Sequence, residues 1–418
     1  MVFKKYIPKL DNLNEYSIYA IILSLILGPA LPDILATLLA IISVYLIFKN
    51  QKIDENFFII ISLFILILIP NIFSKYFPTP FIEQLINIRY FLFSLFICNF
   101  YNLKINNLIN LILLITTIIS LDLIFQYIFK INLIGMEIYA GHNQSRASSF
   151  FGDELIAGAY ILKFSFPVLG YFLFYKKIKL SYGLILLYEI AIIFSGERMN
   201  FLLYNFGLII LLIFNYDKKM IKIAFITFIS ILIILLISIF NFKGVQHRID
   251  TTINSFENNG YVNSQHLAHY IISYNIWKSN ILFGTGHKTF RLECRTKEYL
   301  IKTKSQENRG CATHPHNIYL EALSDSGIFG FISFMFFILF IIFKSFKNKI
   351  HKSEFNGFLI TFYLIVWPLS TNGNFFNNRI AITNFLIIGI IAYASKVNLF
   401  NNLTKINLTK YIEAKKIK

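Results

Sequence analysis

Long apolar runs recur along almost the whole chain, separated by short polar connections. Most of these runs reach the length that a helix needs to cross a bilayer, about 20 residues at a rise of 1.5 Å each. The pattern predicts an all-α integral membrane protein with about twelve transmembrane helices. The first two runs are short and share a hinge that contains Pro29 and Pro32. The expected spans are residues 17–31, 32–48, 57–74, 83–100, 106–128, 155–175, 180–196, 199–215, 220–241, 318–343, 355–371 and 380–397.

One long polar segment, residues 243–317, separates the ninth and tenth expected helices. Within it, residues 264–280 have an amphipathic pattern that places His266 and His269 on one helical face. We therefore expect a large, partly helical loop that covers one face of the membrane bundle. The predicted divisions are helices one to nine in 1–242, the loop in 243–317, helices ten to twelve in 318–397, and a basic tail in 398–418.

Composition and charge support a membrane protein and indicate its orientation. Of 418 residues, 56% are hydrophobic and only 15% are charged, too few for the surface of a soluble protein of this length. The net charge of +17 comes from lysines on alternate connections, as the positive-inside rule requires, so it implies no nucleic-acid partner. This places both termini in the cytoplasm and the long loop outside. The first apolar run has no small-residue cleavage site and is expected to be a spanning helix.

The eight arginines behave differently from the lysines, because on this topology each lies on or close to the outward side. Lysine already supplies the charge needed for orientation, so arginine retained outside suggests a separate role. A planar guanidinium can bind a phosphate through two parallel N–H groups, which lysine cannot do. We expect some of these arginines to bind phosphate and the others to be ordinary loop or ion-pair residues. They are Arg89, Arg146, Arg198, Arg248, Arg291, Arg295, Arg309 and Arg379.

Two of these arginines lie in informative places. Arg198 follows Ser-Gly-Glu in a very short outward turn, which would hold it where a lipid diphosphate lies; the alternative is a snorkelling side chain. Arg89 lies inside an apolar run, where an arginine usually faces a cavity or a charged partner. Lys163 and Glu189 are further charges within expected spans, and we expect them to pair with each other.

The end of the long loop holds the main candidates for chemistry, His314, His316 and Asn317. Asn317 is expected to cap a helix that begins at Ile318. His316 would then lie beside a helix N-terminus, where a neutral imidazole could accept a proton from a sugar hydroxyl. The alternative is a solvated histidine at the membrane interface.

Cysteine positions bear on the same loop. Cys98 lies in an apolar run and is expected to be buried, whereas Cys294 and Cys311 both lie in the long polar segment. If that segment is outside the cytoplasm these two can form a disulfide; in the cytoplasm they would be free thiols. A metal site is not expected, because the loop histidines match no compact ligand spacing and have few acids nearby. Those histidines are His266, His269, His287 and His314.

These motifs together resemble the bacterial O-antigen ligases. His316-Asn317, nine residues, Gly327, two residues and Gly330 follow the pattern His-Asn/Ser/Gln-x9-Gly-x-x-Gly at the end of the ligases' large periplasmic loop. Ser-Gly-Glu-Arg198 looks like their Ser-Gly-x-Arg turn, and Phe283-Gly-Thr-Gly resembles a segment of the same loop. The twelve-helix plan with one long loop is similar as well.

The resemblance implies an inverting glycosyltransferase of the bacterial inner membrane that uses no metal or other cofactor. Its donor would be a glycan on undecaprenyl diphosphate, and its acceptor a sugar hydroxyl of lipid A–core at the periplasmic face, with membrane lipids around it. His316 would act as the base, or position the hydroxyl, and Arg198 would hold the diphosphate and stabilise the charge of the leaving group.

One departure from the family pattern leaves alternatives open. The ligases carry a second functional arginine ahead of the Gly-rich segment, where this chain has histidines; Arg248 and Arg291 lie on either side and could replace it. An O-antigen polymerase of the same superfamily therefore remains an alternative. A lipid-linked oligosaccharide flippase or transporter is less favoured, because no internal repeat is evident and the polar chemistry lies on one face. The remaining candidate substrate-binding residues are Arg89, His266, His269, His314 and Asn317.

Overall fold

In the computed structural model, the regular secondary structure of the described residues is helical. The only β pairings there are two isolated bridges, Ile131 with Glu137 and Tyr139 with Arg146. The predicted all-helical class is confirmed for those residues. The structure describes residues 7–50, 55–100, 103–139, 146–215, 265–296, 298–299, 311–371 and 373–416, and isolated positions among 229–250.

The helices follow the apolar runs of the sequence closely. Before the long polar segment they are α1 (Ile7–Leu27), α2 (Ala30–Asn50), α3 (Glu55–Leu68), α4 (Thr79–Ile86), α5 (Ile88–Phe100), α6 (Ile105–Phe129), α7 (Ala157–Phe174), α8 (Ile178–Ser195) and α9 (Arg198–Phe214). Short 3-10 turns, η2 (Ile69–Phe73) and η4 (Ser149–Phe151), lie between them. The later elements are α12 (Gln265–Ser279), α13 (Phe290–Glu293), α14 (Ile318–Lys347), η6 (Ile350–Lys352), α15 (Asn356–Ile365) and α16 (Asn378–Lys416).

Seven helices in the described residues are long and apolar enough to cross a membrane. Four shorter apolar helices, within α1, α3 with η2, α9 and α15, accompany them. The expected span at 220–241 lies largely outside the described residues, so the total of twelve stays a prediction. The helix α16 continues through the expected basic tail to Lys416, with no break at residue 398. The seven spans are Ala30–Lys49, Thr79–Asn99, Ile105–Phe129, Ala157–Phe174, Ile178–Ser195, Ile318–Lys347 and Asn378–Asn398.

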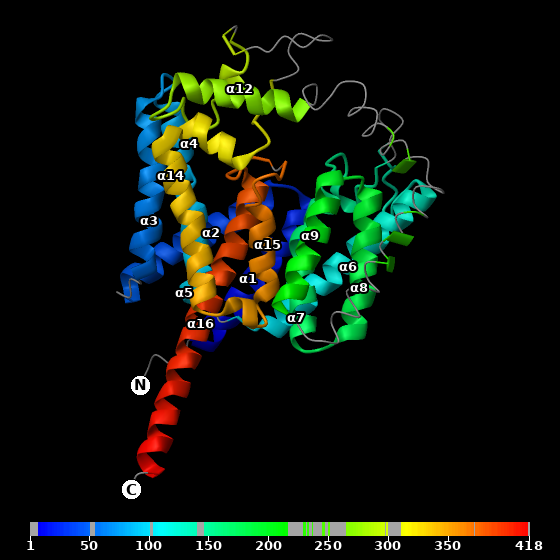
Figure 1. Cartoon of the computed structure of the whole chain (residues 1–418), viewed down its shortest axis with the longest axis vertical. Helices are drawn as coiled ribbons and strands as arrows, with labels where there is room; N and C mark the ends of the chain where they lie inside the picture. Colours follow the sequence, from blue (N-terminus) through cyan, green and yellow to red (C-terminus); the bar gives the residue numbers. More distant parts are fainter. Residues whose placement is uncertain are drawn as a thin grey trace.

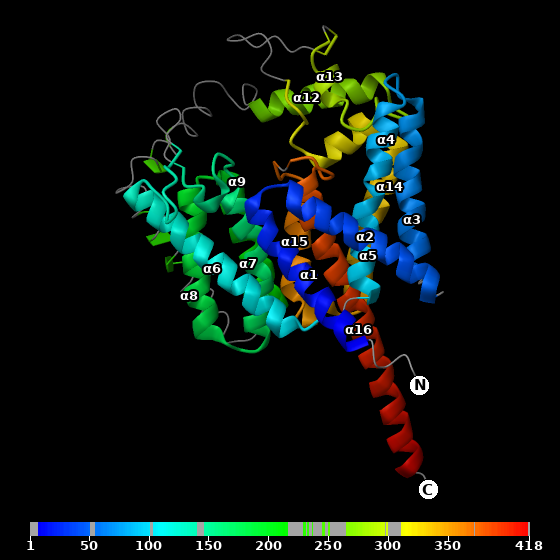
Figure 2. The ribbon, with the colours of Figure 1, turned by 180° about the vertical axis from the view of Figure 1, so that it is seen from behind.

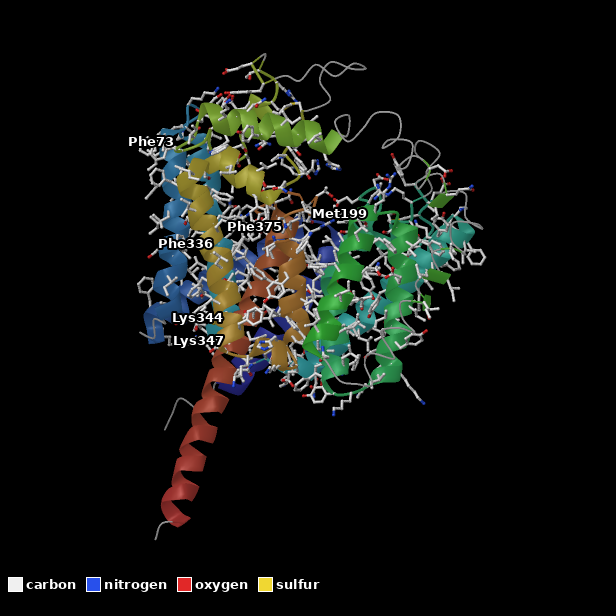
Figure 3. The ribbon with its side chains drawn as sticks, in the orientation of Figure 1. Phe73, Met199, Phe336, Lys344, Lys347 and Phe375 are labelled. Atoms are coloured by element: carbon white, nitrogen blue, oxygen red, sulfur yellow. A yellow bond between two sulfur atoms is a disulfide. The ribbon has the colours of Figure 1, made fainter. Side chains whose placement is uncertain are left out.

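The amphipathic helix predicted at 264–280 is present as α12, and it lies across one end of the bundle (Figure 1). The start of α1 and the end of α16 lie towards the opposite end, as the view from behind also shows (Figure 2). Labelled side chains mark the two ends of the bundle: Met199 and Phe375 lie towards the α12 end, and Lys344 and Lys347 lie at the far end of α14 (Figure 3). The lysines of α14 are therefore at the end away from the long loop, as the orientation argument predicts.

Close packing of α7 against α15 determines the inner wall of the bundle. A side chain at Gly357 would overlap the carbonyl of Phe166, so this glycine lets the two backbones approach each other. Next to it, the hydroxyl of Thr361 donates to the carbonyl oxygen of Lys163 at 2.9 Å. This contact fixes the wall on which Lys163 lies.

The helix α14 is broken at Gly327, which has φ 61° and ψ −163°. The break frees backbone groups that residues 281–286 then satisfy: the N–H of Thr285 donates to the carbonyl of Ser324 at 2.9 Å, and that of Gly286 to Asp325 at 2.8 Å. In return, the N–H of Ile328 donates to the carbonyl of Ile281 at 2.8 Å. The two glycine motifs of the sequence thus form one unit that joins the loop to α14.

We expect Gly327→Ala to destabilise the protein by at least about 2 kcal/mol, because the required φ and ψ are open only to glycine and the added Cβ would overlap the Leu282 carbonyl. Thermal unfolding of the purified protein in detergent would measure this loss. The matched control is Gly183→Ala in α8, where nothing lies within 4 Å of the new Cβ. That control should be neutral or stabilising by up to about 1 kcal/mol. Equal melting temperatures for Gly327→Ala and wild type would contradict the prediction.

Candidate active site

Four histidines from two distant segments meet at the α12 end of the bundle. His266 and His269 come from α12, and His314 and His316 come from the segment that leads into α14. The ring centroid of His316 lies 4.2 Å from that of His314, 5.2 Å from His266 and 5.4 Å from His269. The structure therefore places His316 at the centre of the cluster.

Asn317 holds this segment in place as the N-cap of α14. Its side-chain oxygen accepts from the N–H groups of Tyr319 at 3.0 Å and Leu320 at 3.1 Å, so the predicted cap is confirmed. Its amide nitrogen donates to the carbonyl of Pro368 at 2.7 Å, which ties the start of α14 to the segment after α15. His316 itself has φ 58°, a left-handed conformation that costs a non-glycine residue roughly 1 kcal/mol or more. Such strain is found most often at functional residues.

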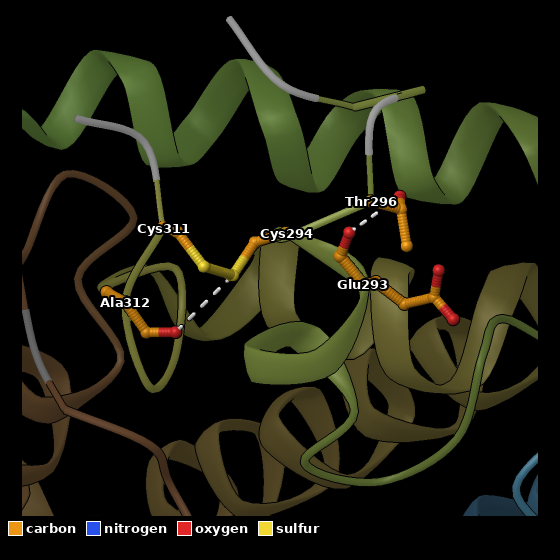
Figure 4. The surroundings of a disulfide bond; sticks show 5 residues. All are labelled: Glu293, Cys294, Thr296, Cys311 and Ala312. Carbon is orange, nitrogen blue, oxygen red and sulfur yellow. Dashed lines mark hydrogen bonds between the residues drawn. A yellow bond between two sulfur atoms is a disulfide. The ribbon is translucent and has the colours of Figure 1, made fainter. Parts of the chain in front are cut away.

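A disulfide between Cys294 and Cys311 secures the segment from the other side, as predicted (Figure 4). It joins the end of α13 to the first residue of the stretch that carries His314 and His316. Cys294 and the nearby Phe290 pack with Ile272 and Ile276 of α12 in a small second core. The disulfide and the cap therefore hold both ends of the histidine-bearing segment against α12 and α14.

The imidazole of His316 is neutral at physiological pH. Burial lowers its pKa to about 3, with further lowering by the neighbouring histidine rings. Burial likewise lowers the pKa of His314 to about 4. Neutral rings keep a lone pair available to accept a proton. Within the described residues, no group of three or more His, Cys, Asp or Glu is arranged to hold a metal ion.

A cavity of about 530 Å³ opens beneath the cluster. His266, His314 and His316 line one part of it, and the rest comes mainly from α1, α7, α15 and α16, with contributions from Arg146, the α8–α9 turn and the segment between α15 and α16. Most of the wall is apolar, formed in part by Leu25, Leu162, Phe164, Ile365 and Phe375. Its charged lining residues are Arg146, Lys163, Glu197 and Arg379.

Glu197 in the α8–α9 turn supplies a carboxylate to this cavity. Its Oε1 accepts from the backbone N–H of Gly158 at 2.8 Å, and its other oxygen accepts from Asn200. A Cβ at position 158 would lie 2.9 Å from Oε1, so glycine is needed for this approach. Burial raises the pKa of Glu197 to about 7, which makes it a group that titrates near neutrality.

We expect the affinity for an anionic ligand in this cavity to increase as pH falls from about 8 to about 6. A carboxyl whose pKa is near 7 is largely ionised at pH 8 and largely protonated at pH 6, so acidification removes one negative charge from the wall. The measurement is the Kd of geranylgeranyl diphosphate across this range. Glu197→Gln should flatten the profile, and an unchanged slope in that variant would assign the titration to another group.

The predicted phosphate-binding arginines do not all line the cavity. Arg198 is the exposed first residue of α9 and lies near Arg146, close enough for the two guanidinium groups to repel each other. Arg89 lies away from the cavity wall and forms an ion pair with Asp33 at 3.0 Å. Arg248 lies outside the described residues.

Arg291 belongs to a separate surface pocket, which it lines together with Arg295, Cys311 and Thr313. It also lies 3.8 Å from a carboxylate oxygen of Glu83. The segment 311–316 thus separates this pocket from the cavity, because its first residues line the pocket and its last residues line the cavity.

Several cavity residues, Glu197 among them, were missed or misplaced by the sequence reasoning. Lys163 does not pair with Glu189, since Glu189 instead accepts from Asn205 at 3.0 Å, and the amine lines the cavity. Arg146 and Arg379 were noted only as outward arginines, yet both reach the same wall. The sequence signal that could have identified these residues was a charge in or beside an apolar run. The direction in which such a side chain points depends on how the helices pack, so the sequence alone did not reveal it.

Comparison with known protein families gives one match. Residues 182–335 match the family model described as O-antigen ligase. The matched region runs from α8 to α14 and contains Arg198, His316 and Gly327. No match was found among curated proteins.

Proposed function

Because the match over residues 182–335 supports the O-antigen ligase superfamily, we propose that this membrane protein transfers a glycan from undecaprenyl diphosphate to a sugar hydroxyl of lipid A–core. The observation that carries the proposal is the position of His316, neutral and constrained at the polar end of a largely apolar cavity with cationic side chains. A cavity of this kind suits a ligand with a polar reactive head, an anionic linker and a lipid tail.

The donor fits the chemistry of the wall. Its diphosphate would lie near Arg146, with Arg198 reaching it from the exposed start of α9, and its first prenyl units would meet apolar side chains such as Leu162 and Phe164. Each guanidinium group can donate two parallel N–H hydrogen bonds to phosphate oxygens. These bonds stabilise the negative charge that develops on the leaving diphosphate. Arg198 is thus assigned to the leaving group, while Arg89 and Arg291, each near a carboxylate, have structural roles.

His316 would serve the acceptor. As the acceptor oxygen bonds to the anomeric carbon, the bond from that carbon to the diphosphate oxygen breaks, and the hydroxyl proton moves to the imidazole. Attack opposite the leaving group inverts the anomeric configuration. The low pKa of His316 in the free protein makes it a weak base, and the negative charge of a bound donor would raise that pKa and strengthen it. His266, His269 and His314 would orient the acceptor sugar, and Asn317 would hold His316 in position.

The membrane orientation is part of the proposal. Lysines at the end of the bundle opposite α12, such as Lys344 and Lys347, favour a cytoplasmic location for that end and for both termini (Figure 3). The histidine cluster would then face the periplasm, where a disulfide is chemically stable. No nucleotide is needed for this reaction, since the donor already carries its leaving group.

The test is transfer in vitro with the purified full chain, a defined glycan on undecaprenyl diphosphate, and rough lipopolysaccharide as acceptor. We expect glycan to appear on lipid A–core, equally with and without a chelator. Longer chains on the carrier lipid, with none on lipid A, would identify the polymerase alternative. Movement of donor across liposomes without transfer to any acceptor would reject the enzyme in favour of a transporter.

A further inference from the structure

Lys163 is a cation placed inside the membrane bundle, and it forms no ion pair with any residue that the structure describes. It lies in α7, six residues after Ala157, and therefore about 9 Å along the helix from its α12 end. Ions within a bilayer are costly and are kept where they face a partner or a functional cavity. Within the described residues no ion pair of Lys163 is found, whereas its side chain lines the cavity beneath His316.

The acids that could neutralise Lys163 are committed to other groups. Glu189 accepts from Asn205, and Glu154 forms an ion pair with Arg379. Glu197 lines the same cavity and acts on Lys163 electrostatically, but its oxygens accept hydrogen bonds from Gly158 and Asn200. Lys163 therefore lines the cavity near a carboxylate with which it forms no ion pair in the described residues.

The charges around the cavity leave an excess that a ligand can neutralise. Three cations line the cavity, and the carboxylates are Glu197 in the wall and Glu154, the ion-pair partner of Arg379, so one positive charge remains when both carboxylates are ionised. A diphosphate that links a glycan to a lipid carries two negative charges and is therefore attracted by this excess. The lining cations are Arg146, Lys163 and Arg379.

We propose that Lys163 binds the phosphate next to the lipid chain, from within the membrane, and that Glu197 is its counter-charge while the cavity is empty. The inference rests on the proposed function, because it assigns Lys163 to the lipid-side phosphate of the donor proposed there. With the glycan at His316 and the prenyl chain in the bilayer, the lipid-linked phosphate is the deeper of the two. The Cα–Cβ bonds of a helix tilt towards its N-terminus, so Lys163 extends back towards the level of Glu197. Lys163 lies outside residues 182–335 and is therefore a feature of this chain beyond the family match.

The experiment measures binding of geranylgeranyl diphosphate to the detergent-purified full chain by titration calorimetry. Lys163→Met keeps the length of the side chain but removes the charge, and we expect the Kd to rise about tenfold or more, as for loss of a charge-assisted hydrogen bond. Glu197→Gln keeps the hydrogen-bond acceptor but removes the opposing charge, so the Kd should fall several-fold at pH 8. The matched control is Lys179→Met, an exposed lysine near the start of α8, and its Kd should equal that of wild type.

The outcomes separate this inference from the proposed function. Wild-type binding with no change in Lys163→Met, or no tightening in Glu197→Gln, would reject the role of Lys163 and leave the transferase proposal intact. Should Lys163→Met fail to fold, the Kd of Lys163→Gln, which also removes the charge, decides the question. Failure of the wild-type protein both to bind the probe and to transfer glycan would reject both proposals. If inorganic pyrophosphate displaces geranylgeranyl diphosphate with equal affinity, the site binds free anions, and the assignment to a lipid-linked phosphate is overturned.

Discussion

Replacing His316 by alanine should reduce glycan transfer to lipid A–core by roughly 10²- to 10⁴-fold, the usual contribution of a positioned general base. His316 lies at the centre of the histidine cluster and lines the cavity, whereas the disulfide and the Asn317 cap hold the segment independently of its side chain. The variant should therefore insert and fold normally. Transfer in vitro under saturating donor measures kcat, where the loss should appear.

The matched control for this experiment is His351→Ala. His351 lies in η6, near the rings of Phe214 and Phe346 and away from the cavity, so its removal should leave transfer within about twofold of wild type. Unchanged kcat in His316→Ala would remove the base from the mechanism. A loss confined to KM for the acceptor would reduce His316 to a residue that positions the hydroxyl.

Arg198→Lys should reduce kcat/KM for the donor by about ten- to a hundredfold although the charge is kept. A lysine amine is a single donor point and cannot make the two parallel N–H contacts of a guanidinium to one phosphate. Arg198 starts α9 beside Arg146, so a ligand that bridges the two groups also relieves their repulsion. Steady-state transfer with varied donor concentration gives the ratio, and the acceptor KM should not change.

The comparison for Arg198 is Arg295→Lys, an exposed arginine in the surface pocket beyond the segment 311–316. Because that pocket is separate from the cavity, this substitution should leave donor kinetics unaltered. Equal donor kinetics for Arg198→Lys and wild type would leave Arg198 as an interfacial residue that helps to set the end of α9. The phosphate role would then pass to Arg146, which lines the cavity directly.

Much of the local structure follows from short-range rules and could be predicted. Apolar runs of sufficient length can only be helices in a bilayer, because every backbone group must be satisfied within the segment. Asn317 before a run of helix-forming residues indicates a cap, and the structure contains it, whereas the break at Gly327 within the expected span 318–343 was not predicted. Two cysteines in one long polar loop were expected to form a disulfide if the loop lies outside the cytoplasm, and the structure contains that disulfide.

The partners of charged residues could not be predicted in the same way. Lys163 and Glu189 lie on neighbouring helices, yet the packing of α7 against α15 turns Lys163 towards the cavity and leaves Glu189 to Asn205. Arg89 meets Asp33 from α2, a helix more than fifty residues earlier in the chain. Each outcome depends on the rotation of a helix about its axis, and an apolar sequence that is hydrophobic on all sides does not determine that rotation.

The sequence by itself therefore determined the helical membrane class of the protein and the helix that starts at Ile318, and it pointed to His316 as the candidate for chemistry, because each rests on local composition or spacing. Only the tertiary structure brought His266, His269 and His314 around His316 and placed Glu197 and Lys163 on one cavity wall. The physical reason is that these contacts join segments far apart in the chain. Their formation depends on how the helices pack, which is a property of the whole bundle and of no single segment.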